Sequence, residues 1–165
     1  PSFMTSKPDL QKDYFDNVCL KRYIANGTPI LGLCRGHQAI AVAFAGKLIQ
    51  HMVHEKNKDE DPFKCVHKIA LDVQNFPILR SFSDIDTIPV NSRHHQAVRE
   101  NSLPNDLAVV ARHPQTQHVE MIAHMALPIV GMQFHPEDIY EDVTCEFVNK
   151  IVFHLINNRK SILQE

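Results

Sequence analysis

The sequence lacks a surplus of positive charge, since 17 lysines and arginines stand against 19 acidic residues and give a formal net charge of −2. This balance argues against nucleic acid or an anionic membrane as the main partner. No apolar run approaches the roughly 20 residues needed to cross a bilayer, and no basic-then-apolar leader opens the chain, so we expect no secretory signal. The 165 residues suit one core, and we predict a single domain over residues 1–165.

Cysteine is also scarce, and its spacing excludes two common kinds of small domain. The four cysteines are scattered and form no CxxC pair, which argues against a disulfide scaffold and against a structural zinc site. A reducing, cytoplasmic compartment is the simplest expectation. Histidine is abundant, with 11 residues, but its spacing is poor for metal binding. His51, His54 and His67 are the nearest to a ligand group, and a polar connection explains them better.

Hydrophobic periodicity predicts an α/β fold. A helix is expected to begin near Ser6 and to end at Asn26-Gly27, with Leu10, Tyr14 and Val18 at helical spacing. A buried strand over 28–33 and a helix over 36–45 follow, and strand, helix and strand in this order indicate an α/β sheet. Polar residues 51–64 predict a solvated excursion. Further strands are predicted at 47–50, 67–73, 87–90, 107–112, 118–123 and 128–134, and a final amphipathic helix at 140–158, with Phe147, Ile151 and Leu155 as its buried stripe.

A nucleophile candidate lies at the junction of the first predicted strand with its helix. Residues 32–36 read GLCRG, and glycines two residues away on each side are typical of a sharp turn that exposes a nucleophile. The helix N-terminus would favour the Cys34 thiolate. The backbone N–H of Arg35 would then point to the position of an oxyanion. The alternative is a buried cysteine between two turn glycines.

A general-base candidate follows the last predicted strand. Residues 131–137 read GMQFHPE, and Pro136 stiffens the turn so that His135 and Glu137 can project from the same side. A nucleophilic cysteine needs an imidazole as base, and the imidazole needs an orienting group. Alone, this tripeptide is an ordinary turn sequence, but the upstream cysteine motif favours the catalytic interpretation.

Three segments together, PILGLCRGHQAIAVAFAGKLIQ, VNSRHHQAV and GMQFHPE, resemble the class I glutamine amidotransferase family. Within that family they are most similar to the gamma-glutamyl-gamma-aminobutyrate hydrolase branch, the C26-type peptidases. The resemblance extends over about residues 7–157. It implies a flavodoxin-like α/β fold with Cys34 as nucleophile, His135 as base and Glu137 as the group that orients the base.

The same resemblance implies further site residues. Gln38, in the helix after the cysteine, matches a position that contacts the substrate glutamyl group. His94 and His95 match a family motif that faces the site, where a substrate-binding role and a structural hydrogen-bonding role are both open.

The resemblance implies hydrolysis of a gamma-glutamyl amide through a cysteine thioester, with no metal and no organic cofactor. The partner is then a small gamma-glutamyl substrate, with a separate synthase subunit or a second copy of the chain as a possible protein partner. The competing hypothesis is a non-catalytic or partner-dependent binding module on the same fold.

Two departures from the family pattern bear on activity. Family members carry further N-terminal strands and a glycine-rich loop that supplies a second oxyanion donor, whereas the first glycine here is Gly27. We therefore expect an N-terminally truncated domain with an exposed sheet edge. It would be either a fragment that needs its other half or a degenerate protein. The second departure is at residues 114–117, where the family often has an Asp-Gly turn.

Overall fold

The computed structural model describes residues 9–52, 64–73 and 85–162, together with positions 76, 79 and 82, and it describes side chains as far as residue 157. The predicted helix cap Ser6 lies outside these residues. Instead Asp9 caps the first helix, because its carboxylate accepts hydrogen bonds from the backbone N–H groups of Gln11 and Lys12. His54 and most of the 51–64 excursion also lie outside the described part.

A six-stranded mixed sheet forms the centre of the fold, in the order β1-β8-β7-β6-β3-β4. Strands β1 and β8 are parallel, and the other neighbours are antiparallel. A separate pair, β2 and β5, is antiparallel. The strands are β1 (Ile30–Leu33), β2 (Lys47–Ile49), β3 (His67–Leu71), β4 (Thr87–Val90), β5 (Ala97–Arg99), β6 (Leu107–Arg112), β7 (Val119–His124) and β8 (Ile129–Met132).

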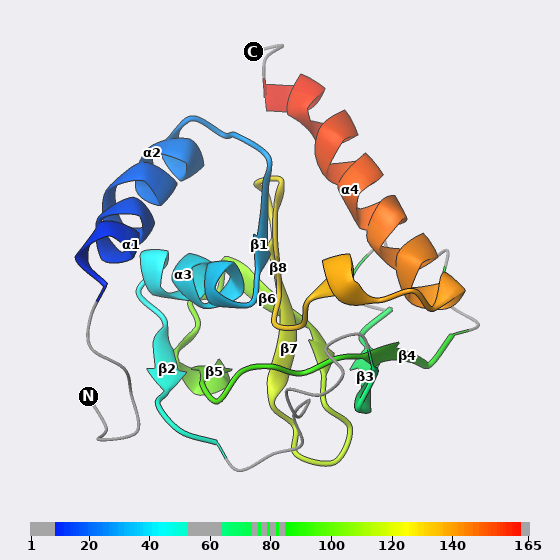
Figure 1. Ribbon diagram of the computed structural model, residues 1–165. Coiled ribbons are helices and arrows are strands. Elements are labelled where there is room, and N and C mark those ends of the chain that lie inside the picture. Colours follow the sequence, from blue (N-terminus) through cyan, green and yellow to red (C-terminus); the bar gives the residue numbers. More distant parts are fainter. Residues whose placement is uncertain are drawn as a thin grey trace.

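Helices cover both faces of this sheet (Figure 1), with α3 and the N-terminal helices on one side of β1 and β8 and α4 on the other. The N-terminal helix is continuous but changes type, because a π-helical stretch (Phe15–Cys19) joins its two α-helical parts. The α-helices are α1 (Leu10–Tyr14), α2 (Leu20–Ala25), α3 (Arg35–Ala43) and α4 (Asp142–Ile162). Two 3-10 turns, Glu100–Ser102 and Pro136–Asp138, complete the elements that matter for the site.

Each face of the sheet has its own hydrophobic core. On the α4 side, Phe147, Ile151 and Leu155 are buried, which confirms the predicted stripe. On the other side, Ile40 of α3 packs with the buried Ile122 of β7 and its neighbours. The sheet with helices packed on both faces confirms the α/β fold class predicted from the sequence.

The N-terminal helix differs from a typical amphipathic helix. Its periodic apolar residues point outward, since Leu10 is 80% exposed, Tyr14 62% and Val18 38%. Leu20 is the one buried residue of the described helical segment before β1. The periodicity predicted the helix correctly but did not identify a buried face.

Strand β1 lies at one end of the sheet. It pairs with β8, and among the described residues no strand pairs with its other edge. This agrees with the expected exposed edge. The strand that leads to Cys34 thus presents unpaired backbone groups on one side. None of the helices in the described part of the chain combines the length and the apolar character required to cross a membrane.

Candidate active site

Cys34 occupies a strained turn between β1 and α3. Its backbone has φ 48° and ψ −99°, although it is not a glycine. A side chain at positive φ is uncommon, and such strain is concentrated at functional sites. The following residue, Arg35, is the first residue of α3. This is the sharp strand-to-helix turn that the GLCRG sequence predicts.

The two glycines of this turn are not equivalent. A Cβ atom on Gly32 would lie 2.5 Å from Ile40 Cδ1 and 2.6 Å from the backbone carbon of Gly36. A Cβ atom on Gly36 would meet nothing within 4 Å. The turn therefore requires a glycine at position 32 for steric reasons. It does not require one at position 36, where the Gly36 backbone itself makes the close approach.

Replacing these glycines should give opposite results. Gly32→Ala is expected to lower the free energy of unfolding by about 3 kcal/mol, because the new methyl group meets backbone that cannot move aside. Gly36→Ala, the matched control, is expected to change it by less than about 1 kcal/mol, in the stabilising direction, because alanine favours a helix. Urea unfolding of both variants tests this, and equal losses of stability would contradict the steric account.

The pairing of β1 with β8 brings the cysteine and histidine segments together. Leu33 is the register partner of Met132, and the Cys34 backbone N–H donates to the Met132 carbonyl at 2.7 Å. His135 follows three residues after Met132, at the carboxyl end of the neighbouring parallel strand. The nucleophile and base candidates therefore share one edge of the sheet, although they are far apart in the sequence.

His135 and Glu137 form the pair that their spacing predicts. His135 Nδ1 lies 2.8 Å from Glu137 Oε1, with the side chains 24% and 50% exposed. The carboxylate can hold the ring so that Nε2 is the nitrogen available for proton transfer. Glu137 also interacts electrostatically with Cys34, as expected for groups that follow neighbouring parallel strands.

A residue that sequence reasoning missed holds His135 in place. The side chain of Asn91, which is fully buried, accepts a hydrogen bond from the His135 backbone N–H at 2.8 Å and donates to the His135 carbonyl at 2.9 Å. Arg93 makes an ion pair with Asp138 in the same turn. Asn91 and Arg93 belong to the VNSRHHQAV segment, so that segment supports the base as well as facing the site.

Burial raises the pKa of the Cys34 thiol, and the negative charge of Glu137 raises it further, whereas the Arg35 backbone N–H, Arg93 and Gln133 oppose the shift. The position at a helix N-terminus therefore does not by itself make a standing thiolate. This differs from the expectation drawn from the sequence, which could not show burial. A thiol of this kind needs a base to remove its proton during the reaction.

A cavity of about 180 Å³ lies beside the cysteine turn, lined in part by Arg35, Gln38 and Gln96. The Arg35 guanidinium bridges to Asp13 at 3.0 Å and to Asp16 at 2.6 Å. These ion pairs attach the N-terminal helix to α3 and make it one wall of the cavity. Gln38, predicted to contact the substrate, is 8% exposed and lines the cavity from α3.

The predicted histidines lie in different surroundings. His94 is 5% exposed, its Nδ1 lies 2.9 Å from the Gln96 carbonyl, and it interacts electrostatically with His135. His95 instead faces His51, with ring centroids 6.4 Å apart. His94 thus has an electrostatic link to the base candidate His135.

Two buried histidines are neutral at physiological pH. Complete burial lowers the pKa of His37 to about 4, and burial also lowers the pKa of His94 to about 4. His37 packs against β8, where Gly131 leaves room for its ring, since a Cβ there would lie 2.7 Å from Nδ1. Glu120, 1% exposed, lies near His37 and is 3.6 Å from His67 Nε2.

These shifts predict that stability falls in mild acid. In the unfolded chain both rings have the ordinary pKa of 6.5, so between pH 6.5 and pH 4 the unfolded chain binds protons that the folded chain does not. Lowering the pH from 7.5 to 5 should remove about 2 kcal/mol of stability for each ring. Urea unfolding at both pH values tests this. His94→Gln should lose about half of the difference, and an unchanged difference in that variant would contradict the account.

Other candidate features do not form a comparable site. In the described part of the chain, one group could bring three ligand atoms within 4.8 Å of one another, and it consists of His135, Glu137 and Asp138. It overlaps the histidine–glutamate pair, and exposed acidic groups of this kind are common without a metal ion. His67, from the histidine group considered at first, contacts the ring of His113 instead.

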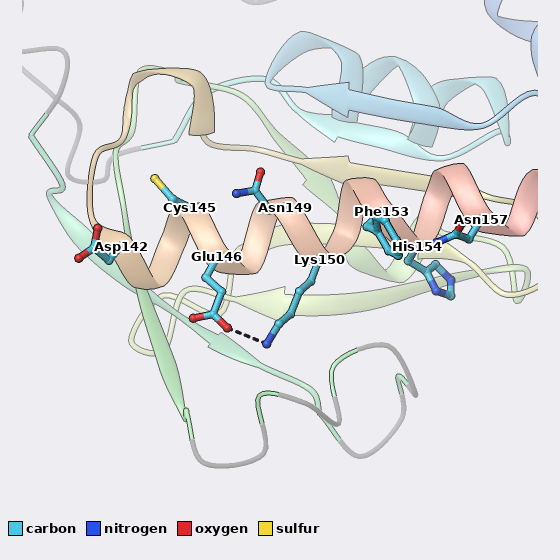
Figure 2. Close-up of a pocket in the computed structure, with 8 residues that line it drawn as sticks. All are labelled: Asp142, Cys145, Glu146, Asn149, Lys150, Phe153, His154 and Asn157. Carbon is cyan, nitrogen blue, oxygen red and sulfur yellow. Dashed lines mark ion pairs between the residues drawn. The ribbon is translucent and has the colours of Figure 1, made fainter.

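A larger cavity of about 750 Å³ is lined by one helix alone (Figure 2). Its eight side chains lie along α4, and Glu146 pairs with Lys150 at 2.8 Å. Phe153, 68% exposed, forms part of this open groove. Cys145 also lines it and donates to the Ile139 carbonyl at 3.3 Å. Among the eight residues that line this groove, no histidine–carboxylate pair like His135–Glu137 is present. The volume of a cavity therefore does not identify the reactive site.

The chain is similar to the peptidase C26 family and to glutamine-dependent synthase subunits. The sequence profile described as Peptidase C26 matches residues 1–137. The chain is 36% identical over 130 residues to a subunit of the glutamine-hydrolysing GMP synthase of Thermococcus kodakarensis, covering 79% of this chain and 62% of that protein. It is 31% identical over 134 residues to anthranilate synthase component 2 of Saccharolobus solfataricus, covering 80% and 63%. The chain thus spans less than two thirds of the length of these curated relatives.

Solved structures agree with this fold. A protein from Thermoplasma acidophilum described as a GMP synthase subunit superposes with a TM-score of 0.66 and 25% identity, covering 88% of this chain and 66% of that chain. A glutamine amidotransferase from Thermotoga maritima superposes with a TM-score of 0.60 and covers 99% and 63%. Its identity of 14% supports likeness of fold alone.

Proposed function

The chain belongs to the peptidase C26 family, whose curated relatives here include glutamine amidotransferases, and from this premise we propose that it hydrolyses gamma-glutamyl amide bonds through a cysteine thioester. One observation carries the proposal. Cys34 occupies a strained turn at the end of β1, and the His135–Glu137 pair, joined at 2.8 Å, follows the parallel strand beside it. This geometry supports Cys34 as the nucleophile, His135 as the base and Glu137 as the orienting group, the three parts that acyl transfer requires.

The proposed acylation begins with proton transfer from the Cys34 thiol to His135 Nε2. The sulfur then forms a bond to the gamma-carbonyl carbon of the substrate, and the carbonyl oxygen takes up the negative charge. The Arg35 backbone N–H stabilises that oxyanion. The C–N bond breaks as His135 returns its proton to the leaving nitrogen, which departs as ammonia or an amine.

Deacylation uses the same groups with water as the attacking molecule. His135 removes a proton from water, the hydroxide adds to the thioester carbonyl, and the C–S bond breaks with its electron pair on sulfur. Glu137 keeps the imidazole in one tautomer and stabilises its cationic form. The sulfur recovers its proton from His135, and the product is the gamma-carboxylic acid of glutamate, which loses its proton to water.

The glutamyl group of the substrate is proposed to bind next to Cys34 and to extend toward the cavity that begins at the following residue, Arg35. Gln38 and Gln96 line this cavity, and His94 Nδ1 lies 2.9 Å from the Gln96 carbonyl. Burial lowers the pKa of His94 to about 4, so at neutral pH it would act as a neutral hydrogen-bonding group and not as a cation. His95 remains a candidate contact of the same loop.

Trapping the thioester with hydroxylamine tests the proposed reaction directly. The full chain is incubated with glutamine, or with gamma-glutamyl amines, in the presence of hydroxylamine, and the expected product is gamma-glutamyl hydroxamate. Cys145→Ala, on the groove of α4, is the control that should retain activity. Release of glutamate without hydroxamate, or binding of glutamine without either product, would reject the thioester route.

A partner-dependent module is the second candidate, and two observations favour it. The chain spans less than two thirds of the length of its curated relatives, and β1, which leads to Cys34, has an unpaired edge among the described residues. Relatives are described as components of anthranilate synthase and GMP synthase. We therefore include a synthase subunit, or a second copy of this chain, as a proposed partner at that edge.

Size-exclusion chromatography separates these partners. A dimer would support pairing between copies of the chain, whereas a monomer over the micromolar range would count against it. A monomer that forms hydroxamate only after a synthase subunit is added would support the synthase partner.

A further inference from the structure

Gln133 lies beside Cys34 because of the register between β1 and β8. Leu33 and Met132 are partners across the parallel pair, so the next residue of each strand, Cys34 and Gln133, also lie side by side. Gln133 is fully buried, and its Nε2 is 3.7 Å from Cys34 Sγ, within hydrogen-bonding distance for sulfur. The sequence alone did not single out this residue, although it stands in the GMQFHPE segment.

The neighbouring side chain fixes the orientation of the Gln133 amide. Gln38 Nε2 donates one hydrogen to the Gln96 carbonyl at 3.0 Å and the other to Gln133 Oε1 at 3.1 Å. An amide nitrogen has two hydrogens and cannot accept. Rotating the Gln133 amide by half a turn would therefore set two NH2 groups against each other. The network requires the Gln133 oxygen to face Gln38 and its nitrogen to face the sulfur.

We propose that Gln133 is a catalytic residue whose side-chain N–H donates to the Cys34 sulfur when the sulfur carries negative charge, and that Gln38 is a positioning residue that orients it. The inference deepens the proposed function and rests on it for its place in catalysis. It also gives Gln38 a role different from direct donation to the substrate, since both of its amide hydrogens are directed to protein acceptors.

Charge develops on this sulfur twice in the proposed cycle. It appears when the thiol loses its proton to His135, and again when the C–S bond of the thioester breaks with the electron pair on sulfur. A hydrogen bond to a charged acceptor is stronger than one between neutral groups, and more so where water is excluded. Burial raises the pKa of Cys34 and the Gln133 hydrogen bond opposes that shift, which is the direction the proposal needs.

The test is the pH dependence of Cys34 alkylation by iodoacetamide, followed by mass spectrometry of the peptide that contains it. Gln133→Met keeps the length of the side chain but removes the donor. It should slow alkylation near neutral pH about tenfold and move the midpoint of the profile to higher pH. Gln133→Glu keeps an oxygen for Gln38 but loses the N–H to sulfur, and it should shift the midpoint in the same direction.

Gln38→Met should shift the midpoint in that direction by less. The double variant with Gln133→Met should shift it no further than Gln133→Met alone, because Gln38 acts through Gln133. Alkylation of Cys145 in the same samples is the internal control and should be unchanged. Far-UV circular dichroism and cooperative unfolding establish that each variant is folded.

An unchanged midpoint in either folded Gln133 variant would overturn the catalytic role, and additive shifts in the double variant would overturn the positioning role of Gln38. The readout needs no substrate, so it is independent of hydroxamate formation. If the midpoint shifts but the wild-type chain forms no hydroxamate, the proposed function fails while the assignment of Gln133 to the thiol stands. If hydroxamate forms and the midpoint does not shift, the proposed function stands and the assignment of Gln133 to the thiol fails.

Discussion

Cys34→Ala is expected to reduce the rate of gamma-glutamyl hydroxamate formation by at least about 10⁴-fold, since removal of a nucleophile eliminates the covalent route. Alanine retains the Cβ atom, so the backbone keeps the same turn with φ 48°. The free energy of unfolding should therefore change little compared with the change in rate. Steady-state rates with glutamine and hydroxylamine, measured beside urea unfolding, give both quantities.

The matched controls for this variant are the other described cysteines. Cys19, Cys65 and Cys145 are partly buried free thiols, and burial raises the pKa of Cys65 to about 12. Alanine at Cys19 or Cys145 should leave the rate within about twofold of wild type, because the proposed histidine–carboxylate pair, His135–Glu137, follows the strand beside Cys34 and not these positions. Retained hydroxamate formation in Cys34→Ala would show that another group carries the acyl intermediate.

His135→Ala is expected to lower the same rate by about 10³- to 10⁴-fold. The Cys34 thiol has its pKa raised by burial, so without a base too little thiolate forms near neutral pH. The loss should appear in kcat more than in KM, because the imidazole acts on the proton and not on the glutamyl group. His154→Gln, on the outer side of α4, is the control that should retain activity.

Glu137→Gln should have a smaller effect than His135→Ala, about 10²-fold. The Glu137 side chain is half exposed, so water can partly replace its hydrogen bond to the ring. The order of the two effects is the discriminating result. A larger loss in Glu137→Gln than in His135→Ala would assign Glu137 a direct role in proton transfer and contradict the arrangement proposed here.

Much of the fold could be predicted from the sequence because its signals are local. An apolar run predicts strand β1, the turn at Gly46 predicts the end of helix α3, and apolar residues at helical spacing predict helix α4. Each element lies within a few residues of its expected position. Strand β5 (Ala97–Arg99) was missed, since three residues carry no period. The exposure of Leu10 and Tyr14 could not be predicted from the sequence. Periodicity shows that apolar residues share one face of a helix, but not whether another element covers that face.

In the site, too, contacts between residues close in the sequence could be predicted, and contacts between distant segments could not. The turn at Cys34 and the contact between His135 and Glu137 depend on a few consecutive residues, and spacing was enough to predict them. Asn91 and Gln133 act through contacts across strands, with Asn91 on the His135 backbone and Gln133 on the sulfur. Both stand in motifs that were noted for other residues, and only the folded structure shows what they contact, through the β1–β8 register for Gln133 and through hydrogen bonds from the end of β4 for Asn91.

Backbone angles at the hairpin between β6 and β7 explain one departure from the family pattern. Gln117 has φ 59°, a conformation that glycine adopts without strain. The Asp-Gly turn common in the family would supply such a glycine. Here the Gln117 side chain donates to the Pro114 carbonyl at 2.7 Å, which closes a hydrogen bond within the turn.

The most direct test of the central claim is covalent labelling with diazo-oxo-norleucine, a glutamine-mimicking electrophile, followed by mass spectrometry to locate the adduct, with iodoacetamide as the control reagent. The account predicts a single adduct on Cys34 that is lost in His135→Ala, because labelling requires the nucleophile, the base and the glutamyl pocket together. Absence of the mimic adduct, while Cys34 remains open to iodoacetamide, would contradict it and show that this chain does not assemble the site alone.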